Sequence, residues 1–235
     1  MRILISATVL AALLFVSPAT AAERNYSVTS FDRIRVEGGY RVRLATGVAP
    51  FATASGSPAA LDGVAIDVQG RTLVVRVNRS GWGGYPGGAR GPVEIMLGTP
   101  DLAAAWVNGS GSLAIDRVRG LAFDLAIQGS GAATIDRVEV DQFKLALSGA
   151  ASARLAGKAA RMTAVVRGSS SFDGASLAVK DATIGAEGPA IVKLQVSNAA
   201  KVDALGTASV TLTGDPACTV KTQGSAVVEG CKPAN

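Results

Sequence analysis

The chain of 235 residues contains no histidine and only two cysteines, and aromatic residues make up 5% of it. Without histidine a Ser-His-Asp triad cannot form, and no Ser-x-x-Lys motif replaces it. Few aromatics and scattered basic residues argue against nucleic-acid recognition, although the formal charge is +5. The composition therefore predicts no catalytic triad, no metal site, no cofactor and no nucleic-acid partner.

Long hydrophobic runs are also scarce. The longest occupies residues 3–16, which is shorter than the roughly 20 residues that a membrane-spanning helix needs. Arg2 precedes this run and Ala19, Thr20 and Ala21 follow it, which is the arrangement of a secretory signal peptide. We therefore predict a signal peptide over residues 1–22, no transmembrane segment in the remainder, and export to the periplasm, the outer-membrane surface or the extracellular space.

Both cysteines, Cys218 and Cys231, lie near the C-terminus. In an oxidising compartment such an isolated pair is most often a disulfide. We therefore predict a Cys218–Cys231 disulfide.

Glycine marks an internal repeat. Turn-like clusters recur every 18–20 residues, at Gly109, Gly129, Gly149, Gly168, Gly188, Gly206 and Gly224. The residue four places after each of these glycines is apolar in every repeat, and the intervening residues are mostly small or polar. This alternation with a period of two is typical of a strand with one buried face. A second alternating segment precedes each following glycine, so each repeat supplies at least two short strands.

A unit this small buries its apolar face only by stacking on its neighbours. Stacking in register places Leu113 next to Ala133 and Ile115 next to Ile135. The sequence therefore predicts an all-β, parallel β-solenoid with about 18–20 residues per repeat over residues 101–235. In such a coil the Gly-Ser-Gly segments are corners, because glycine accepts positive φ and close backbone approach, and strands rather than phosphate-binding helices follow them.

The preceding part, residues 23–100, is predicted to be less regular β structure that belongs to the same single domain (23–235). Segment 31–47 alternates on both sides of Gly38 and Gly39, which predicts a hairpin that pairs Val36 with Val42 through the loop 38–40. If the two strands lie on successive coils instead, this pairing fails. A short helix is expected within 57–64, two strands within 64–78 and another at 92–97.

Several segments follow one another in a distinctive order: FDRIRVEGGYRVRLATG (31–47), TLVVRV (72–77), PVEIMLGTPDL (92–102) and the serial GSGSL, GSGAATI and SGAAS segments. In this order they resemble the putative auto-transporter adhesin, head GIN domain family. The resemblance covers roughly residues 29–230. It implies an all-β, solenoid-like fold in exported bacterial proteins, and it implies no catalytic residues.

The segment SGWGGYPGGARG (80–91) is the part of the sequence that folding explains least. Trp82, Tyr85 and Arg90 stand there among glycines, without alternation. Aromatic residues on a surface loop stack on sugar rings or anchor protein contacts, so these three are our candidate ligand-binding residues. The alternative is a connector whose aromatics fold back over the end of the coil. Trp106 is expected to cap the end of the solenoid.

Asp116 and Asp136 lie 20 residues apart and should stack on adjacent coils. Paired carboxylates at such spacing could cleave glycosides, so a small carbohydrate-active enzyme is one alternative. A solvated ladder with Arg117 and Arg137 is the simpler interpretation. We expect a non-enzymatic, adhesin-like binding or structural module of the cell envelope, with a surface glycan or an envelope protein as partner. A second alternative is a structural protein that associates with itself through open sheet ends.

Overall fold

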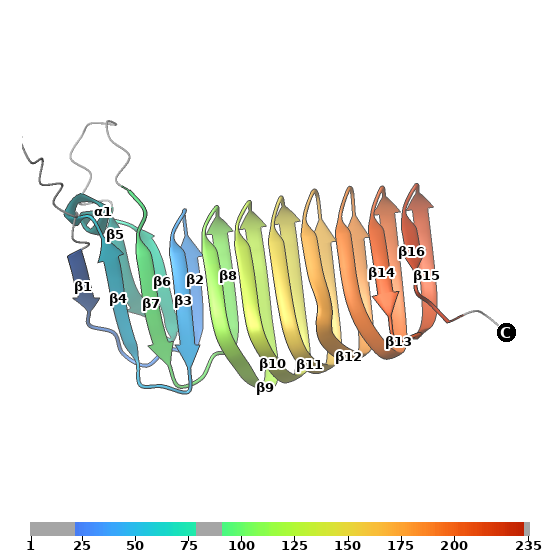
Figure 1. Cartoon of the computed structure of the whole chain (residues 1–235), viewed down its shortest axis with the longest axis horizontal. Helices are drawn as coiled ribbons and strands as arrows, with labels where there is room; N and C mark the ends of the chain where they lie inside the picture. Colours follow the sequence, from blue (N-terminus) through green and yellow to red (C-terminus); the bar gives the residue numbers. More distant parts are fainter. Residues whose placement is uncertain (1–21, 79–90, 233–235) are drawn as a thin grey trace, which may run out of the picture.

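The computed structural model describes residues 22–78 and 91–232. Strands account for 74% of these described residues and helix for 3%, and the strands form a β-solenoid of about six turns. The predicted all-β solenoid is therefore confirmed, and Figure 1 shows its coils stacked side by side along one long axis. No helix in these two described ranges is both long and apolar enough to cross a membrane. The predicted signal peptide falls, except for Ala22, outside the described residues.

Each regular coil is one long, bent strand, and each strand pairs in parallel with the next. The strands are β9 (Ser112–Gly129), β10 (Ala132–Gly149), β11 (Ser152–Arg167), β12 (Ser171–Glu187) and β13 (Ile191–Gly206). We call the part after each glycine corner the first arm and the part before the next corner the second arm. The sequence predicted two separate strands per repeat. The structure joins them because the ladder continues around the second bend, with Arg137 opposite Arg117 and Val138 opposite Val118.

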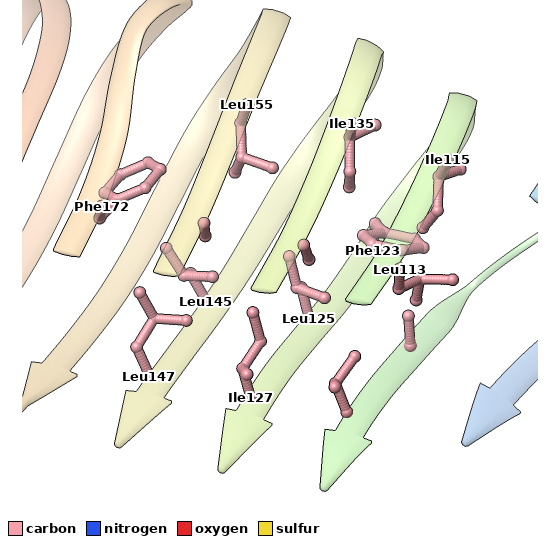
Figure 2. Close-up of a cluster of buried hydrophobic side chains, with 14 of the residues drawn as sticks. Leu113, Ile115, Phe123, Leu125, Ile127, Ile135, Leu145, Leu147, Leu155 and Phe172 are labelled. Atoms are coloured by element: carbon pink, nitrogen blue, oxygen red, sulfur yellow. The ribbon is translucent and has the colours of Figure 1, made fainter. Parts of the chain in front are cut away.

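The predicted stacking register is confirmed. Ala133 lies opposite Leu113, and Ile135 lies opposite Ile115. All four side chains are buried. Figure 2 shows side chains from both arms pointing into one shared interior.

Within a coil, a large core side chain on one arm is matched by a small one on the other arm, so that the coil interior is filled. The coil of β10 combines Ala133 on its first arm with Phe143 on its second arm, whereas β12 combines Phe172 with Ala182. Phe143 also packs against Phe123 of the preceding coil, with 5.5 Å between the ring centroids. A Cβ at residue 174 would lie 2.7 Å from the Phe172 ring, which explains why glycine interrupts the aliphatic pattern there. Buried apolar residues form one core cluster from Phe31 to Leu212.

The corners stack directly on one another. Gly129 has φ of +108°, and a Cβ there would approach the carbonyl oxygen of Gly109 to 2.6 Å. The amide of Ser130 donates to that same oxygen at 3.0 Å. Only a residue without a side chain satisfies both constraints. The Gly-Ser-Gly segment is therefore a structural corner, as the sequence predicted.

The predicted hairpin around Gly38 and Gly39 is wrong. Strand β2 (Arg33–Glu37) pairs in parallel with β6 (Thr72–Val77) and β8 (Ala104–Gly109), while β3 (Arg41–Thr46) pairs in parallel with β7 (Glu94–Thr99) and β9. Residues 38–40 are thus another coil corner, and the Gly38 amide donates to the Asn108 carbonyl at 2.9 Å. Both arrangements turn Val36 and Val42 toward one core, so alternation alone does not distinguish them.

The N-terminal end of the solenoid is closed by antiparallel strands and a helix (Figure 1). On the first-arm side, β4 (Phe51–Gly56) pairs antiparallel with β7, and β1 (Ala22–Tyr26) pairs antiparallel with β4. On the second-arm side, β5 (Val64–Gln69) pairs antiparallel with β6.

Helix α1 (Pro58–Asp62) lies between these strands, as expected, and buries Ala60 and Leu61. Its N-cap Ser57 accepts a hydrogen bond from the Ala60 amide. Arg24 of β1 donates to Asp62 at 2.7 Å, a bond that raises the pKa of the guanidinium.

Trp106 does not cap the solenoid. It lies on the second arm in β8, between Arg35 of β2 and Ala126 of β9 in the ladder. Its half-buried ring lies on the outer surface, because the flanking residues Ala105 and Val107 point into the core. The Arg35 guanidinium stands 5.8 Å from the ring centroid. The prediction was wrong because the strand in which Trp106 lies has partner strands on both sides.

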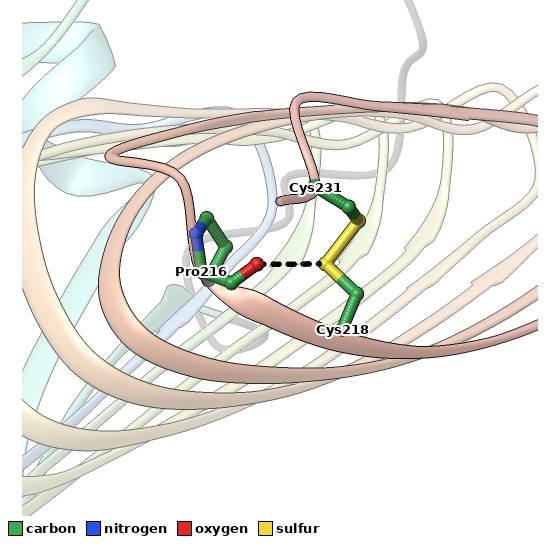
Figure 3. Close-up of a disulfide and its surroundings, with 3 residues drawn as sticks. All are labelled: Pro216, Cys218 and Cys231. Atoms are coloured by element: carbon green, nitrogen blue, oxygen red, sulfur yellow. Dashed lines mark hydrogen bonds between the residues drawn. A yellow bond between two sulfur atoms is a disulfide. The ribbon is translucent and has the colours of Figure 1, made fainter. Parts of the chain in front are cut away.

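The last coil consists of β14 (Ser209–Thr213), β15 (Ala217–Gly224) and β16 (Val227–Glu229). Figure 3 shows the predicted disulfide there, with Cys218 bonded to Cys231 at 2.10 Å. The amide of Lys232 donates to the Pro216 carbonyl at 3.0 Å. The disulfide prediction is confirmed, and the bond holds the end of the chain against β15.

Candidate binding surfaces

The three residues that we predicted as ligand contacts, Trp82, Tyr85 and Arg90, lie outside the described residues. Their role stays a prediction. The described residues that flank this segment are Asn78, which follows β6, and Gly91, which precedes β7. The amide of Asn78 donates to the Gly63 carbonyl at 2.9 Å, just after helix α1. Asn78 therefore lies beside helix α1, at the N-terminal end of the solenoid.

A hollow of about 220 Å³ lies on the outer surface of the first arms. We call it the first-arm hollow. Its lining residues come from β3, β4, β7, β9 and β10 and are Arg43, Leu44, Ala45, Phe51, Met96, Leu97, Ala114, Ile115, Asp116 and Asp136. Strands separated by up to about 90 residues of sequence thus contribute to one surface, because neighbouring coils carry them side by side.

Apolar side chains in and beside this hollow are unusually exposed. Phe51 is 39% exposed and Met96 is 55% exposed, and neighbouring Val48 is 40% exposed. The Phe51 ring packs against Gly98, where a Cβ would come within 2.3 Å of a ring carbon. Gly98 therefore lets the ring lie against the sheet. Exposed apolar side chains grouped together on a rigid sheet are typical of an interaction surface.

Charged groups accompany these apolar side chains. Arg43 neighbours Met96 in the ladder, and Asp136 lies on the exposed outer side of β10. In the part of the chain that the structure describes, neither residue has an ion-pair partner within 4.0 Å. Their hydrogen-bonding groups are thus available to a ligand beside the Phe51 ring.

The two candidate acids line the same hollow but differ in their surroundings. One carboxylate oxygen of Asp116 accepts hydrogen bonds from the Thr46 amide at 3.0 Å, from the Thr46 hydroxyl at 3.2 Å and from the Arg117 amide at 2.6 Å. Asp116 therefore anchors the end of β3 to β9. Asp136 makes no such contact among the described residues. Both carboxylates are exposed, but among the described residues only that of Asp116 is hydrogen-bonded within the protein.

The charge ladder predicted at Asp116, Arg117, Asp136 and Arg137 is not formed by ion pairs among the described residues. Ion pairs between adjacent coils occur at other positions, as Arg119–Glu139 at 3.0 Å, Arg154–Asp173 at 3.2 Å and Arg167–Glu187 at 3.0 Å. Sequence reasoning missed them. Opposite charges separated by one repeat length were the signal that could have found them.

A second hollow of about 530 Å³ lies on the outer surface of the second arms. Its walls are mainly polar, and its lining residues are Arg35, Glu37, Gly38, Gln69, Val74, Arg76 and Val77. The Arg76 guanidinium is paired with Asp67 at 3.2 Å, and Arg35 covers Trp106. The Trp106 ring beside Arg35 is therefore already engaged, which makes the first-arm hollow the better candidate for an apolar ligand face.

No group of three His, Cys, Asp or Glu side chains in the described ranges is placed to hold a metal ion. The candidate surfaces therefore consist of aromatic, aliphatic and charged side chains on rigid strands. Such surfaces bind a ligand by stacking and hydrogen bonds.

Solved structures with the same fold include proteins of Bacteroides and Parabacteroides species. A putative adhesin from Bacteroides fragilis superposes with a TM-score of 0.80 at 15% identity, covering 89% of this chain and 95% of that one. A putative adhesin from Parabacteroides merdae gives 0.71 at 15% identity, covering 92% and 98%. A protein from Parabacteroides distasonis, described as a putative lipid binding protein, gives 0.72 at 16% identity, also covering 92% and 98%. At these identities the likeness concerns the fold.

A comparison with curated proteins gives no match. A family model, however, matches residues 30–216. This span holds all of the strands from β2 to β14 and both hollows. The chain belongs to the putative auto-transporter adhesin, head GIN domain family.

Proposed function

We propose that this protein is an exported, non-enzymatic binding module of the bacterial cell envelope, and that it contacts a surface glycan or an envelope protein through the outer faces of its coils. Membership of an adhesin-like family supports the binding role and an envelope location. Export rests on the predicted signal peptide. The proposal rests on the exposed Phe51 and Met96 of the first-arm hollow, which lie beside Arg43 and Asp136, two residues without an ion-pair partner in the described part of the chain.

A glycan fits this combination of groups best. A pyranose ring has an apolar face that stacks on an aromatic ring, and its hydroxyls bond to carboxylate and guanidinium groups. Phe51 offers the ring, while Asp136 and Arg43 offer an acceptor and donors at its side. The sheet beneath is held by backbone ladders on both sides, so a ligand would meet a preorganised surface and lose little binding energy to ordering it.

A glycosidase mechanism requires two carboxyl groups that can act on the substrate. Asp116 already accepts three hydrogen bonds from the protein, which favours a structural role for it. Binding without turnover is therefore the stronger proposal.

A glycan and envelope-protein array tests the proposal. The protein should retain a subset of glycans, and Phe51→Ala should weaken that binding about tenfold, equivalent to about 1.4 kcal/mol. Leu121→Ala is the matched control, because Leu121 is 79% exposed on another part of the surface. Trp82→Ala in the same experiment reports on the 80–91 loop.

The proposal fails if the wild type binds no glycan and no envelope protein. It also fails if Phe51→Ala and Trp82→Ala both bind as tightly as the wild type. If the wild type released reducing sugar from a bound glycan and Asp136→Asn did not, the result would favour the glycosidase alternative instead.

A further inference from the structure

The methionines of the described ranges differ sharply in accessibility. Met162 is 2% exposed and points into the core from the second arm of β11, whereas Met96 is 55% exposed on the outer surface of β7. Met1 lies outside the described residues. Cys218 and Cys231 are joined to one another, and the described ranges contain no free cysteine. The thioether of Met96 is therefore the sulfur most open to an oxidant in this part of the chain, because exposed sulfur is oxidised first.

The strand holds the Met96 side chain apart from the core. Its neighbours Ile95 and Leu97 are buried and point inward, so Met96 points outward. Strand β7 pairs with β3 on one side and with β4 on the other, which fixes the backbone at this position. A polar oxygen added to Met96 therefore leaves the buried packing unchanged. The same oxygen on Met162 would place a polar group in the apolar interior, where it is costly.

Two side chains flank Met96 in the ladder, Arg43 on β3 and Thr53 on β4. The Thr53 hydroxyl donates a hydrogen bond to the Asn25 side chain at 2.9 Å, so this donor is already used. Arg43 has no ion-pair partner within 4.0 Å in the described part of the chain. A guanidinium carries several N–H donors. Oxidation of Met96 to a sulfoxide would therefore bring a hydrogen-bond acceptor next to an available donor.

We propose that Met96 is an oxidation site, and that its oxidation by hydrogen peroxide closes the first-arm hollow to an apolar ligand face. The thioether sulfur takes one oxygen atom from the peroxide as the O–O bond breaks, giving a sulfoxide and water. The sulfur supplies the electron pair that reduces the peroxide. A methionine sulfoxide reductase reverses the change, as a dithiol is oxidised to a disulfide and the oxygen leaves as water. The Cys218–Cys231 disulfide is typical of an oxidising compartment.

The sulfoxide changes the hollow in two ways. Met96 and Phe51 form its exposed apolar side, and a polar sulfoxide there has to lose water before an apolar ligand face can cover it. The Arg43 guanidinium donates to the sulfoxide oxygen and is no longer available to a ligand. The loss of ligand binding rests on the function proposed above, because it concerns the same hollow. The oxidation of Met96 itself does not depend on any ligand.

Peptide mass spectrometry of the folded protein after a peroxide titration tests the oxidation site. Met96 sulfoxide should form at least about tenfold faster than Met162 sulfoxide, because the fold shields Met162. In denaturant the two rates should be equal. The far-UV circular dichroism of protein oxidised at Met96 should match that of the untreated protein. Equal rates in the folded protein, or loss of the fold on oxidation of Met96, overturn the proposal.

Anilinonaphthalene sulfonate, a dye with aromatic rings and one anionic group, is the probe of the hollow. The part of its binding that Phe51→Ala removes belongs to the hollow, and peroxide should weaken that part about tenfold. Met96→Leu keeps an apolar side chain without sulfur, so its own dye affinity should be the same before and after peroxide. Met162→Leu is the matched control, which conserves the core volume and should respond to peroxide as the wild type does.

Two results of the dye titration overturn the proposal. One is dye binding at the hollow that oxidation of Met96 leaves unchanged. The other is dye binding that Phe51→Ala leaves unchanged, because the hollow would then accept no apolar face.

The glycan and envelope-protein array distinguishes the failure of this proposal from the failure of the proposed function. If the untreated protein binds no glycan and no envelope protein, the proposed function fails, and the dye titration still decides whether Met96 controls the hollow. If the untreated protein binds and the protein oxidised at Met96 binds equally well, the proposed function stands and control by Met96 is refuted.

Discussion

Replacing a corner glycine by alanine should destabilise the fold in two ways: through the left-handed backbone conformation and through the collision of the new methyl group with the neighbouring coil. Two of the glycines allow these two effects to be measured separately. Gly168 has φ of +72°, and a Cβ there would lie 2.6 Å from the carbonyl oxygen of Gly149. Gly47 has nearly the same φ, +75°, but a Cβ there would meet nothing within 4 Å. Gly168→Ala and Gly47→Ala therefore share the cost of the left-handed backbone and differ only in the collision with the neighbouring coil.

The shared cost is small. An alanine in the left-handed region costs about 1–2 kcal/mol, partly offset by about 0.4–1 kcal/mol of lost freedom in the unfolded chain. We expect Gly47→Ala to lower the free energy of unfolding by about 1 kcal/mol or less. At Gly168 the oxygen in the way belongs to backbone that is fixed in the ladder. Overpacking of this kind adds about 1–3 kcal/mol, so the total loss should reach about 2–4 kcal/mol.

Thermal unfolding followed by far-UV circular dichroism measures both variants. For a domain of this size each kcal/mol lowers Tm by about 2–4 °C. Gly168→Ala should therefore melt about 5–10 °C below the wild type, and Gly47→Ala within about 3 °C of it. Equal losses in the two variants would refute the explanation, since backbone conformation alone would then account for the glycines at the corners.

Two further predictions follow from the contacts between coils. Replacing Cys218 and Cys231 together by serine should lower the free energy of unfolding by about 3 kcal/mol, since the bond closes a short loop. The oxidised and the reduced wild-type protein should differ by the same amount. An unfolding midpoint that is unchanged by the double substitution would contradict this prediction. Glu139→Gln removes the exposed ion pair with Arg119. In a denaturant titration it should change the free energy of unfolding by less than about 1 kcal/mol. A larger loss would show that the ion pairs between coils contribute substantially to stability.

The regular coils could be predicted from the sequence because the same kind of residue recurs at each repeat. Leu113 and Ala133 differ in size, yet both are apolar and both follow a corner by the same number of residues. Their register follows from this spacing alone. Local sequence therefore fixes these coils once stacking is assumed.

The N-terminal part could not be predicted in the same way. The partners of β2 are β6 and β8, which lie far along the chain, and no repeat links them to it. A hairpin through residues 38–40 buries the same valines, so local alternation favoured the wrong pairing. Trp106 was misplaced for a related reason, because the sequence does not show that β2 continues the sheet beside it.

The first-arm hollow was equally hidden. Arg43, Phe51, Met96 and Asp136 come from four different strands, and no two of them form a motif. Only the order of strands in the sheet brings them together. The sequence drew attention to Asp116 and Asp136 for their spacing, but it could not show that Thr46 uses the first of these carboxylates.

The disulfide also decides how the last coil responds to tension. The strands lie across the long axis (Figure 1), so a pull along that axis loads the hydrogen bonds between coils lengthwise and detaches one coil at a time. A force applied at Lys232 passes through the sulfur–sulfur bond from Cys231 to Cys218, bypassing the rest of β15 and all of β16. Residues 219–230 then carry no load, and mechanical unravelling has to begin at the start of β15, where Ala217 and Cys218 pair with β13.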